Sequence, residues 1–206
     1  MSEKLRRLVV ATRNRKKTAE IREKLAGICE VVDVRGLEEE GFDLPEVEET
    51  GVTFLENATL KAEAISQRIG GWVLADDSGL EVDALDGRPG VWSSSFGGEE
   101  GNHVKNNEKL CSELASVPEE KRGGRFRCVM VLASGGQKVA DFAGSVEGTL
   151  LSEARGEEGF GYDPHFIPDG FEQTFAELGI EVKNRLSHRA KALEKVVSWL
   201  RERENL

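Results

Sequence analysis

The sequence predicts an α/β fold with a mixed β-sheet flanked by helices. Short apolar runs typical of buried strands alternate with helical stripes, and a Gly135-Gly136 turn joins two strand-like runs directly. Strands joined by so tight a turn are antiparallel, so the sheet must be mixed. The 206 residues hold no internal repeat, low-complexity segment or long linker, which predicts one domain over residues 1–206.

The N-terminal part of the chain predicts a strand, a helix and a second strand. Leu8–Ala11 is apolar and gives way to the polar, basic segment Thr12–Lys17, which opens a helical pattern. Glu30–Val34 supplies the second strand. The acidic, aperiodic segment Arg35–Glu48 that follows predicts a surface loop.

A capped helix comes next. Thr53 and Glu56 have the spacing of a capping box, and the apolar stripe that follows them ends at Gly70-Gly71, a typical helix stop. The sequence therefore predicts a helix between these two signals.

The segment after this helix carries two adjacent acids. Trp72 to Ala75 predicts a buried strand that ends in a sharp turn at Asp76-Asp77-Ser78-Gly79. Because adjacent side chains of an extended segment point to opposite sides, one acid faces a given pocket and the other must be satisfied behind it. A carboxylate at a strand end can hold a divalent cation or take a proton from water. Alternatively, the segment is an Asx-type turn in which an Asp caps its own backbone.

The second half of the chain predicts further strands and two helices from its alternation, turn residues and caps. The predicted elements are a half-buried strand at Leu80–Leu85, a turn at Asp86–Gly90, a helix at Asn102–Val117 with Val104, Cys111 and Leu114 inward, strands at Arg125–Ala133 and Lys138–Ala143, and a Ser187-capped helix with Ala190, Leu193, Val197 and Leu200 inward.

Basic side chains gather at the first helix start. Backbone N–H groups there, with Lys17 nearby, predict a phosphate site; the alternative is a solvated turn in which Thr12 or Asn14 caps the helix. Glu49 precedes the second helix and Lys61 lies off its apolar stripe, where a lysine is usually solvated.

Two C-terminal segments also carry side chains suited to ligands. The glycine-rich loop Gly159–Pro164 holds Phe160, which can stack on a nucleobase, or which plugs the core together with Tyr162. His188 and Arg189 place cations in the first turn of a helix, which costs stability unless an anion or an electron-rich ligand offsets them.

Composition excludes several classes of protein. The 28 Lys and Arg against 38 Asp and Glu give a net charge of −10, which argues against broad nucleic-acid binding. Met1–Arg7 lacks a signal-peptide apolar region and no segment has the apolar length of a membrane span, so we expect a cytoplasmic protein without a membrane partner. Cys29, Cys111 and Cys128 are odd in number and lack metal-ligand spacing, which predicts buried, reduced thiols.

Five segments together resemble the inosine triphosphate pyrophosphatase family, which hydrolyses noncanonical purine nucleoside triphosphates. They run in the family's order over nearly the whole chain. Trp92-Ser93-Ser94-Ser95 departs from the family, whose members often carry tyrosine and arginine there. The matching segments are Thr12-x-Asn14-x-x-Lys17, Glu49-Thr50-Gly51 with Phe54-x-Glu56-Asn57-Ala58, Ala75-Asp76-Asp77-Ser78-Gly79-Leu80, Gly159-Phe160-Gly161-Tyr162-Asp163-Pro164, and Ser187-His188-Arg189.

The resemblance implies an elongated α/β fold of two lobes with the active-site cleft between them, usually as a homodimer. It implies Mg²⁺-dependent conversion of dITP, ITP, XTP or dXTP to the monophosphate and pyrophosphate, which cleanses the nucleotide pool. Asp77 is then the general base and a metal ligand, and Glu49 is a second metal ligand. The implied substrate-binding residues are Thr12, Arg13, Asn14, Arg15, Lys16, Lys17, Lys61, Ser78, Phe160, Gly161, Tyr162, Asp163, Lys183, His188 and Arg189.

These implied roles agree with the chemistry of the residues. Mg²⁺ held by two carboxylates can bridge phosphate oxygens and activate water. Donors from His188 and Arg189 suit a 6-keto oxygen better than a 6-amino group. Two alternatives stay open: a Maf-like nucleotide pyrophosphatase that acts on pyrimidine or modified nucleotides, and a non-catalytic nucleotide-binding protein.

Overall fold

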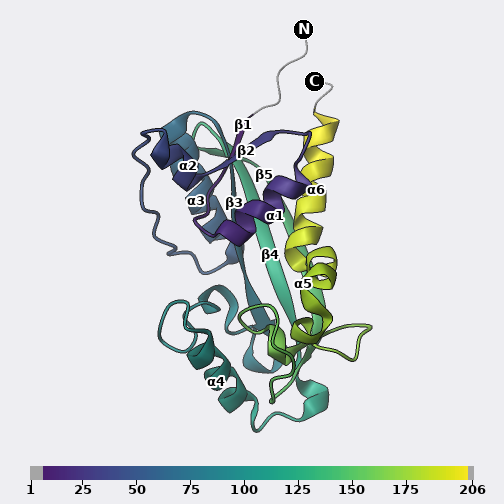
Figure 1. Ribbon diagram of the computed structural model, residues 1–206. Helices are drawn as coiled ribbons and strands as arrows, with labels where there is room; N and C mark the ends of the chain where they lie inside the picture. The colour runs from purple at the N-terminus through teal and green to yellow at the C-terminus, as the bar shows by residue number, and fades with distance from the viewer. Residues whose placement is uncertain (1–6, 204–206) are drawn as a thin grey trace. The chain divides into compact units, whose positions relative to one another are not determined.

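The computed structural model describes residues 7–203, which form strands and helices in alternation. In chain order, the strands and α-helices are β1 (Arg7–Val10), α1 (Arg15–Lys24), β2 (Glu30–Asp33), α2 (Val34–Glu39), α3 (Phe54–Ile69), β3 (Trp72–Val82), α4 (His103–Leu114), β4 (Gly123–Ser134), β5 (Gln137–Leu150), β6 (Phe166–Pro168), α5 (Phe175–Leu186) and α6 (His188–Glu202) (Figure 1).

The strands form one six-stranded sheet with the order β2-β1-β3-β4-β5-β6. β1 pairs in parallel with both β2 and β3, so that Leu8 faces Val31 on one side and Trp72 on the other. β6 runs antiparallel to β5. The predicted α/β class with a mixed sheet is therefore confirmed.

The chain divides into two compact units. The described residues of unit 1 fall within Met1–Asp77, Val129–Ala143 and Lys191–Leu206, and unit 2 comprises Ser78–Cys128 and Gly144–Ala190. The chain passes from one unit to the other within β3, β4, β5 and α6. Each unit is consequently assembled from segments that lie far apart in the sequence.

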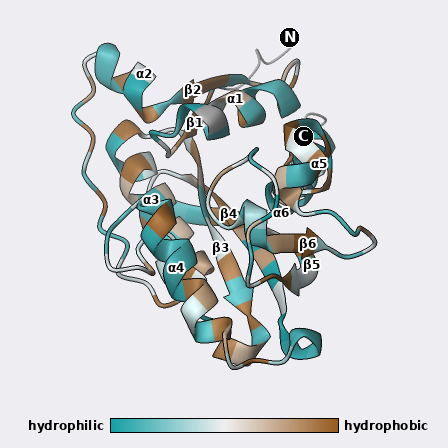
Figure 2. Ribbon diagram, turned by 60° about the horizontal axis from the view of Figure 1, so that its bottom comes forward, coloured by the Kyte–Doolittle hydropathy of each residue, from teal (hydrophilic) through white to brown (hydrophobic). Residues whose placement is uncertain are grey.

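In unit 1, α3 covers one face of the strands and α1 lies on the opposite face (Figure 1). Val9 and Val73 of the strands pack with Ala58, Ala62 and Ile65 of α3 in one buried cluster. Small alanine side chains allow the helix to come close to the sheet. α3 carries both hydrophobic and hydrophilic residues (Figure 2), and its exposed side includes Leu55 and Leu60 as well as Gln67 and Arg68.

The ends of α3 follow the predicted signals. The Thr53 side chain accepts a hydrogen bond from Glu56 N, and the Glu56 side chain accepts one from the Thr53 backbone, which completes a capping box. Gly70 ends the helix in the left-handed conformation, at φ 68°. The helix prediction for this segment is confirmed.

Unit 2 is built around aromatic rings. Phe126 and Phe166 have ring centroids 4.7 Å apart, and Phe166 and Phe175 stack at 5.4 Å. Leu110 and Leu114 of α4 join the same buried cluster. Such large rings make the core of this unit from few residues, because each buries a large apolar area.

The prediction that β3 ends at its acids is wrong. The strand continues through Asp76–Gly79 as far as Val82, and only then does a 3-10 turn follow. A Cβ at Gly79 would lie 2.5 Å from Gly90 O and 2.3 Å from Ser93 Oγ. Gly79 is therefore required for the close approach of a neighbouring segment and not for a turn.

The surface loop predicted at Arg35–Glu48 is wrong in its first part, where α2 forms. Asp33 caps this helix, because its Oδ1 accepts a hydrogen bond from Gly36 N at 3.0 Å. Val34 and Leu37 are buried on its inner side. The helix is short, so it shows no recognisable period in the sequence.

The inward faces of α4 and α6 also differ from the prediction in part. Val104, predicted inward, is 68% exposed, because the buried stripe of α4 runs through Asn106, Leu110 and Leu114. In α6 the fully buried valine is Val196 and not Val197. The helix α5, which begins at a second capping box, was not predicted.

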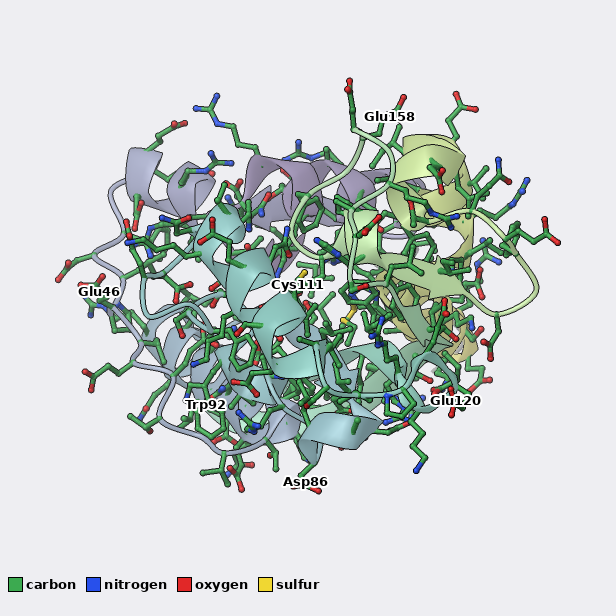
Figure 3. All side chains as sticks on the ribbon, turned by 90° about the horizontal axis from the view of Figure 1, so that it is seen from below. Glu46, Asp86, Trp92, Cys111, Glu120 and Glu158 are labelled. Atoms are coloured by element: carbon green, nitrogen blue, oxygen red, sulfur yellow. The ribbon has the colours of Figure 1, made fainter. Side chains whose placement is uncertain are left out.

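The three cysteines take part in no disulfide, as predicted. Cys29 and Cys128 are buried, whereas Cys111 of α4, labelled in Figure 3, is half-buried with its Sγ 3.7 Å from His165 Nδ1. Burial lowers the pKa of His165 and raises the pKa of Cys111, so both side chains are kept neutral. This pair therefore belongs to the interior of unit 2.

Within residues 7–203, no helix combines the length and the apolar character needed to cross a bilayer. The expectation that the N-terminal segment is no targeting signal falls mainly on residues 1–6, outside the described part of the chain.

Candidate active site

The two acids of β3 have separate partners in unit 1. Both side chains are buried and alternate along the strand. Asp76 Oδ2 accepts a hydrogen bond from Lys17 Nζ at 2.7 Å, and Asp77 Oδ2 accepts one from Asn57 Nδ2 at 3.0 Å. The side chain of Asp76 is thus satisfied by an ion pair, while Asp77 is oriented by a neutral amide.

The segment Thr12–Lys17 is the capped start of α1. Asn14 Oδ1 accepts a hydrogen bond from Lys17 N at 3.3 Å, and Thr12 Oγ1 accepts one from Asn14 N at 3.2 Å. The helix cap considered for this segment is therefore present. It leaves the other N–H groups of the first turn at the helix start, where they can meet an anion.

The remaining basic residues of this segment differ in their surroundings. Arg13 forms an ion pair with Glu38 of α2, and Arg15 is exposed in the first turn of α1. The backbone of Lys16 lies in the same turn. Arg15 is consequently the arginine of this segment that stands most open to a phosphate.

Lys61 is held by Glu49 and is not simply solvated. Its Nζ lies 3.1 Å from Glu49 Oε1, and its side chain is largely buried. The pair joins α3 to the segment that precedes it. The sequence indicated an unusual position for both residues but not their contact.

Asn57 connects Asp77 to the backbone of the segment that carries Glu49. Its Oδ1 accepts a hydrogen bond from Gly51 N at 2.8 Å, while its Nδ2 donates to Asp77. The side chain is buried within α3. It thereby ties the Glu49–Gly51 segment to Asp77. We did not predict Asn57 as a site residue, although an asparagine on the buried face of a helix was the available signal.

The donor set of unit 1 fits Mg²⁺. Asp77 and Glu49 offer carboxylate oxygens only, which are the ligands of a hard cation. Within residues 7–203, no three or more His, Cys, Asp or Glu side chains form a metal-binding group. Mg²⁺ typically uses one or two carboxylates and completes its shell with waters and substrate phosphates. Two carboxylates therefore suffice for such a site.

In unit 2, a buried ion pair fixes the loop that carries Phe160. Lys183 of α5 pairs with Asp163, and both side chains are buried. Asp163 Oδ2 also accepts a hydrogen bond from Phe160 N at 2.8 Å. A Cβ at Gly159 would lie 2.3 Å from this oxygen, so only glycine fits there. The loop backbone is wrapped around one carboxylate.

The two aromatic residues of this loop have different environments. Phe160 is 41% exposed, with Lys183 Nζ 4.0 Å from its ring centroid. Tyr162 is buried in the core, where burial raises the pKa of its phenol, and its hydroxyl donates to Ser93 O at 2.8 Å. Of the two alternatives for this loop, core packing holds for Tyr162, while the ring of Phe160 stays accessible.

Ser93, which we did not predict as a site residue, binds the backbone of β3. Its Oγ accepts a hydrogen bond from Leu80 N at 2.8 Å and donates one to Gly90 O at 2.6 Å. Because its carbonyl also receives the Tyr162 hydroxyl, Ser93 links β3 to the Phe160 loop. A serine among three consecutive serines carries no signal of this role in the sequence.

His188 and Arg189 begin α6 and are both buried. Ser187 caps the helix as predicted, since its Oγ accepts a hydrogen bond from Ala190 N at 3.1 Å. The His188 ring stacks on Phe126, with centroids 5.2 Å apart and an interplanar angle of 15°. Packing against Phe126 therefore fixes the plane of this imidazole.

The predicted site residues fall into two groups, one in each unit. Asp77 ends the first group along the chain and the half-buried Ser78 begins the second. Unit 1 holds the predicted phosphate and metal residues, and unit 2 holds the other predicted substrate-binding residues. Unit 1 contains Thr12, Arg13, Asn14, Arg15, Lys16, Lys17, Glu49, Lys61 and Asp77; unit 2 contains Ser78, Phe160, Gly161, Tyr162, Asp163, Lys183, His188 and Arg189.

Comparison with protein families identifies the chain. The model of the Ham1 family matches residues 8–199, nearly the whole chain. This protein belongs to the Ham1 family. The dITP/XTP pyrophosphatase of Oceanobacillus iheyensis is 44% identical over 95% of this chain and 98% of that protein. The dITP/XTP pyrophosphatase of Geobacter sulfurreducens is 50% identical over 91% of this chain and 92% of its own length.

A solved Ham1 structure shares the fold. The HAM1 protein from Coxiella burnetii has a TM-score of 0.88 and 35% identity, covering 96% of this chain and all of that one. The resemblance to the pyrophosphatase family inferred from five motifs is thus confirmed over nearly the full length.

The bridging role of Asn57 leads to a stability prediction. Asn57→Ala should lower the free energy of unfolding by about 1–3 kcal/mol, because buried hydrogen bonds to Gly51 and Asp77 are lost. Asn57→Asp keeps the acceptor for Gly51 but places a carboxylate against that of Asp77. At pH 7.5 this variant should therefore lose more of the free energy of unfolding than Asn57→Ala. Urea unfolding at pH 7.5 and 5.0 measures both variants.

The pH dependence separates the bridge from simple packing. Two facing carboxyls bind protons more readily folded than unfolded, so Asn57→Asp should recover stability relative to wild type as the pH falls. Asn184→Ala, at an exposed position of α5, is the matched control and should change stability by less than about 0.5 kcal/mol. Wild-type stability of Asn57→Asp at pH 7.5 would contradict the bridge.

Proposed function

We propose that this chain hydrolyses dITP, ITP, XTP and dXTP to the nucleoside monophosphate and pyrophosphate. The observation that carries the proposal is 44% identity over 95% of the chain to a dITP/XTP pyrophosphatase. The reaction removes noncanonical purine nucleotides from the nucleotide pool. It makes this Ham1 protein a hydrolase of nucleoside triphosphates.

Asp77 is proposed as the general base. Its carboxylate is buried and oriented by Asn57 Nδ2 at 3.0 Å, and we assign to it the proton of the attacking water. Glu49 and Asp77 would hold Mg²⁺, which when bound supplies positive charge against the phosphates. Lys61 keeps Glu49 in place through its ion pair.

The start of α1 is proposed as the phosphate site. Lys17 carries three N–H donors and uses one on Asp76, so it can share its ammonium with a phosphate oxygen. The first-turn N–H groups and Arg15 add further donors. A glycine-rich loop is not needed here, because the N–H groups at the start of α1 and the side chains of Lys17 and Arg15 supply the donors for the anion.

His188 and Arg189 are proposed to recognise the 6-keto oxygen of the purine base. His188 and Arg189 offer N–H donors from the first turn of α6, and Phe160 offers an accessible ring for stacking. Adenine would place an amino group against those donors and leave them unpaired, which a site built for one hydrogen-bonding group rejects strongly.

We further propose one pyrophosphatase domain over residues 1–206, with an elongated two-lobed shape and a cleft between the lobes. We also propose that the protein acts in the cytoplasm as a homodimer. These proposals rest on the family resemblance alone.

A nucleotide panel tests the proposed function. Pyrophosphate release should be fastest from ITP and XTP and should stop when EDTA removes Mg²⁺. Faster release from CTP or UTP would favour the Maf-like alternative. Binding of ITP without pyrophosphate release would favour the non-catalytic alternative.

Asp77→Asn should lower the turnover of ITP by more than about a hundredfold while preserving the fold. The amide keeps an oxygen for Asn57 Nδ2 but neither takes the water proton nor binds Mg²⁺ well. Asp86→Asn is the control, because Asp86 is exposed in a turn (Figure 3) with φ 54°, which asparagine tolerates. Steady-state kinetics with equal melting temperatures checks this, and near wild-type turnover would exclude Asp77 as the base.

Arg189→Ala should narrow the preference for ITP over ATP chiefly by reducing kcat/KM for ITP. The guanidinium is proposed to donate to the 6-oxygen, which ATP lacks. Arg185→Ala, at an exposed position of α5, is the matched control. We would measure kcat/KM for ITP, XTP, GTP and ATP. An equal fall of kcat/KM for all four nucleotides would mean that Arg189 serves phosphate binding or structure instead.

A further inference from the structure

One face of α4 lies along the loop that carries Phe160. Asn107 Nδ2 donates a hydrogen bond to Gly161 O at 3.0 Å. His103, one helical turn earlier, has its ring centroid 6.4 Å from that of Phe160, with the two planes inclined by 45°. Residues four apart share a helix face, so the same side of α4 provides both contacts.

The ring of Phe160 has a cation and an imidazole as neighbours. Lys183 Nζ lies over the ring, 4.0 Å from its centroid, and is held there by its ion pair with Asp163. His103 has no such restraint from a buried partner, because its side chain is exposed at the first residue of α4. The imidazole is therefore the neighbour that can turn to admit a flat ligand.

The two rings lie close to the arrangement that would flank a base, but they would have to move to admit one. A base stacked between two rings needs them roughly 7 Å apart and nearly parallel. The observed 6.4 Å and 45° differ from this arrangement by a small shift and a ring rotation. Both Phe160 and His103 are accessible, whereas Asn107 holds the loop backbone at Gly161 in place.

We propose that His103 is a substrate-binding residue whose imidazole covers the second face of a base stacked on Phe160. The proposal rests on the proposed function, because it needs a base at Phe160. Stacking depends on ring area and not on exocyclic groups. His103 therefore contributes equally to ITP, XTP and GTP and leaves the choice between keto and amino groups to other residues.

His103→Ala should raise the KM for ITP by about tenfold with kcat unchanged, because a stacking contact acts in the ground state and transition state alike. His103→Phe keeps a flat ring and should stay within about threefold of wild type. Val104→Ala is the matched control, since Val104 is the next residue of α4 and is 68% exposed. Melting temperatures establish that all three variants fold.

Inorganic tripolyphosphate separates base binding from phosphate binding. It carries no base, so its inhibition constant should be the same for wild type and His103→Ala. An unchanged KM for ITP in His103→Ala would overturn the proposal. The proposal would also be overturned if His103→Ala weakened the inhibition by tripolyphosphate as much as it raised the KM for ITP. It would equally be overturned if His103→Phe raised the KM as much as His103→Ala.

Direct binding distinguishes failure of this inference from failure of the proposed function. If the wild-type protein releases no pyrophosphate from ITP, the proposed function fails, and calorimetric titration with ITP then tests His103 by itself. Weaker ITP binding by His103→Ala but not by His103→Phe would support stacking of His103 on the base. Equal binding by wild type and both variants would overturn it.

Discussion

The arrangement of unit 1 depends on one constraint, the continuity of β3 through its two acids. Because the strand stays extended, Asp76 and Asp77 must leave it on opposite sides, and each needs its own donor once buried. Lys17 reaches Asp76, and Asn57 reaches Asp77. A turn at this point would have allowed both carboxylates to face water, with no need for either partner.

The two donors differ in kind, which has a chemical consequence. The ammonium of Lys17 offsets the charge of Asp76, so that acid has a structural partner of opposite sign. The amide of Asn57 orients Asp77 through a neutral hydrogen bond and adds no positive charge of its own. Since the same amide also holds Gly51, the distance from Asp77 to the Glu49 segment is set by one buried side chain.

Several features that the sequence predicted correctly have a local cause. Capping boxes, helix stops and strand alternation depend on residues a few positions apart, and at Thr53, Gly70 and Ser187 they are observed as expected. Gly79 was misread because its reason is steric and comes from Gly90 and Ser93, more than ten residues away. The site was predictable as a set of motif residues, but Asn57 binds the side chain of Asp77 and Ser93 binds the backbone of Leu80, contacts over more than ten residues that no spacing in the sequence reveals.

The ion pair of unit 2 restricts what Lys183 can do. In unit 2, Asp163 holds Lys183 and the backbone of Phe160 at once, so moving the lysine toward another anion would leave a buried carboxylate without its partner. Breaking such a buried pair typically costs about 3–5 kcal/mol. Lys183 of α5 is therefore a fixed support of the loop that presents Phe160. Packing likewise fixes His188, whose ring stacks on Phe126, so the proposed recognition of a 6-keto oxygen would use a donor whose plane is set by the core of unit 2.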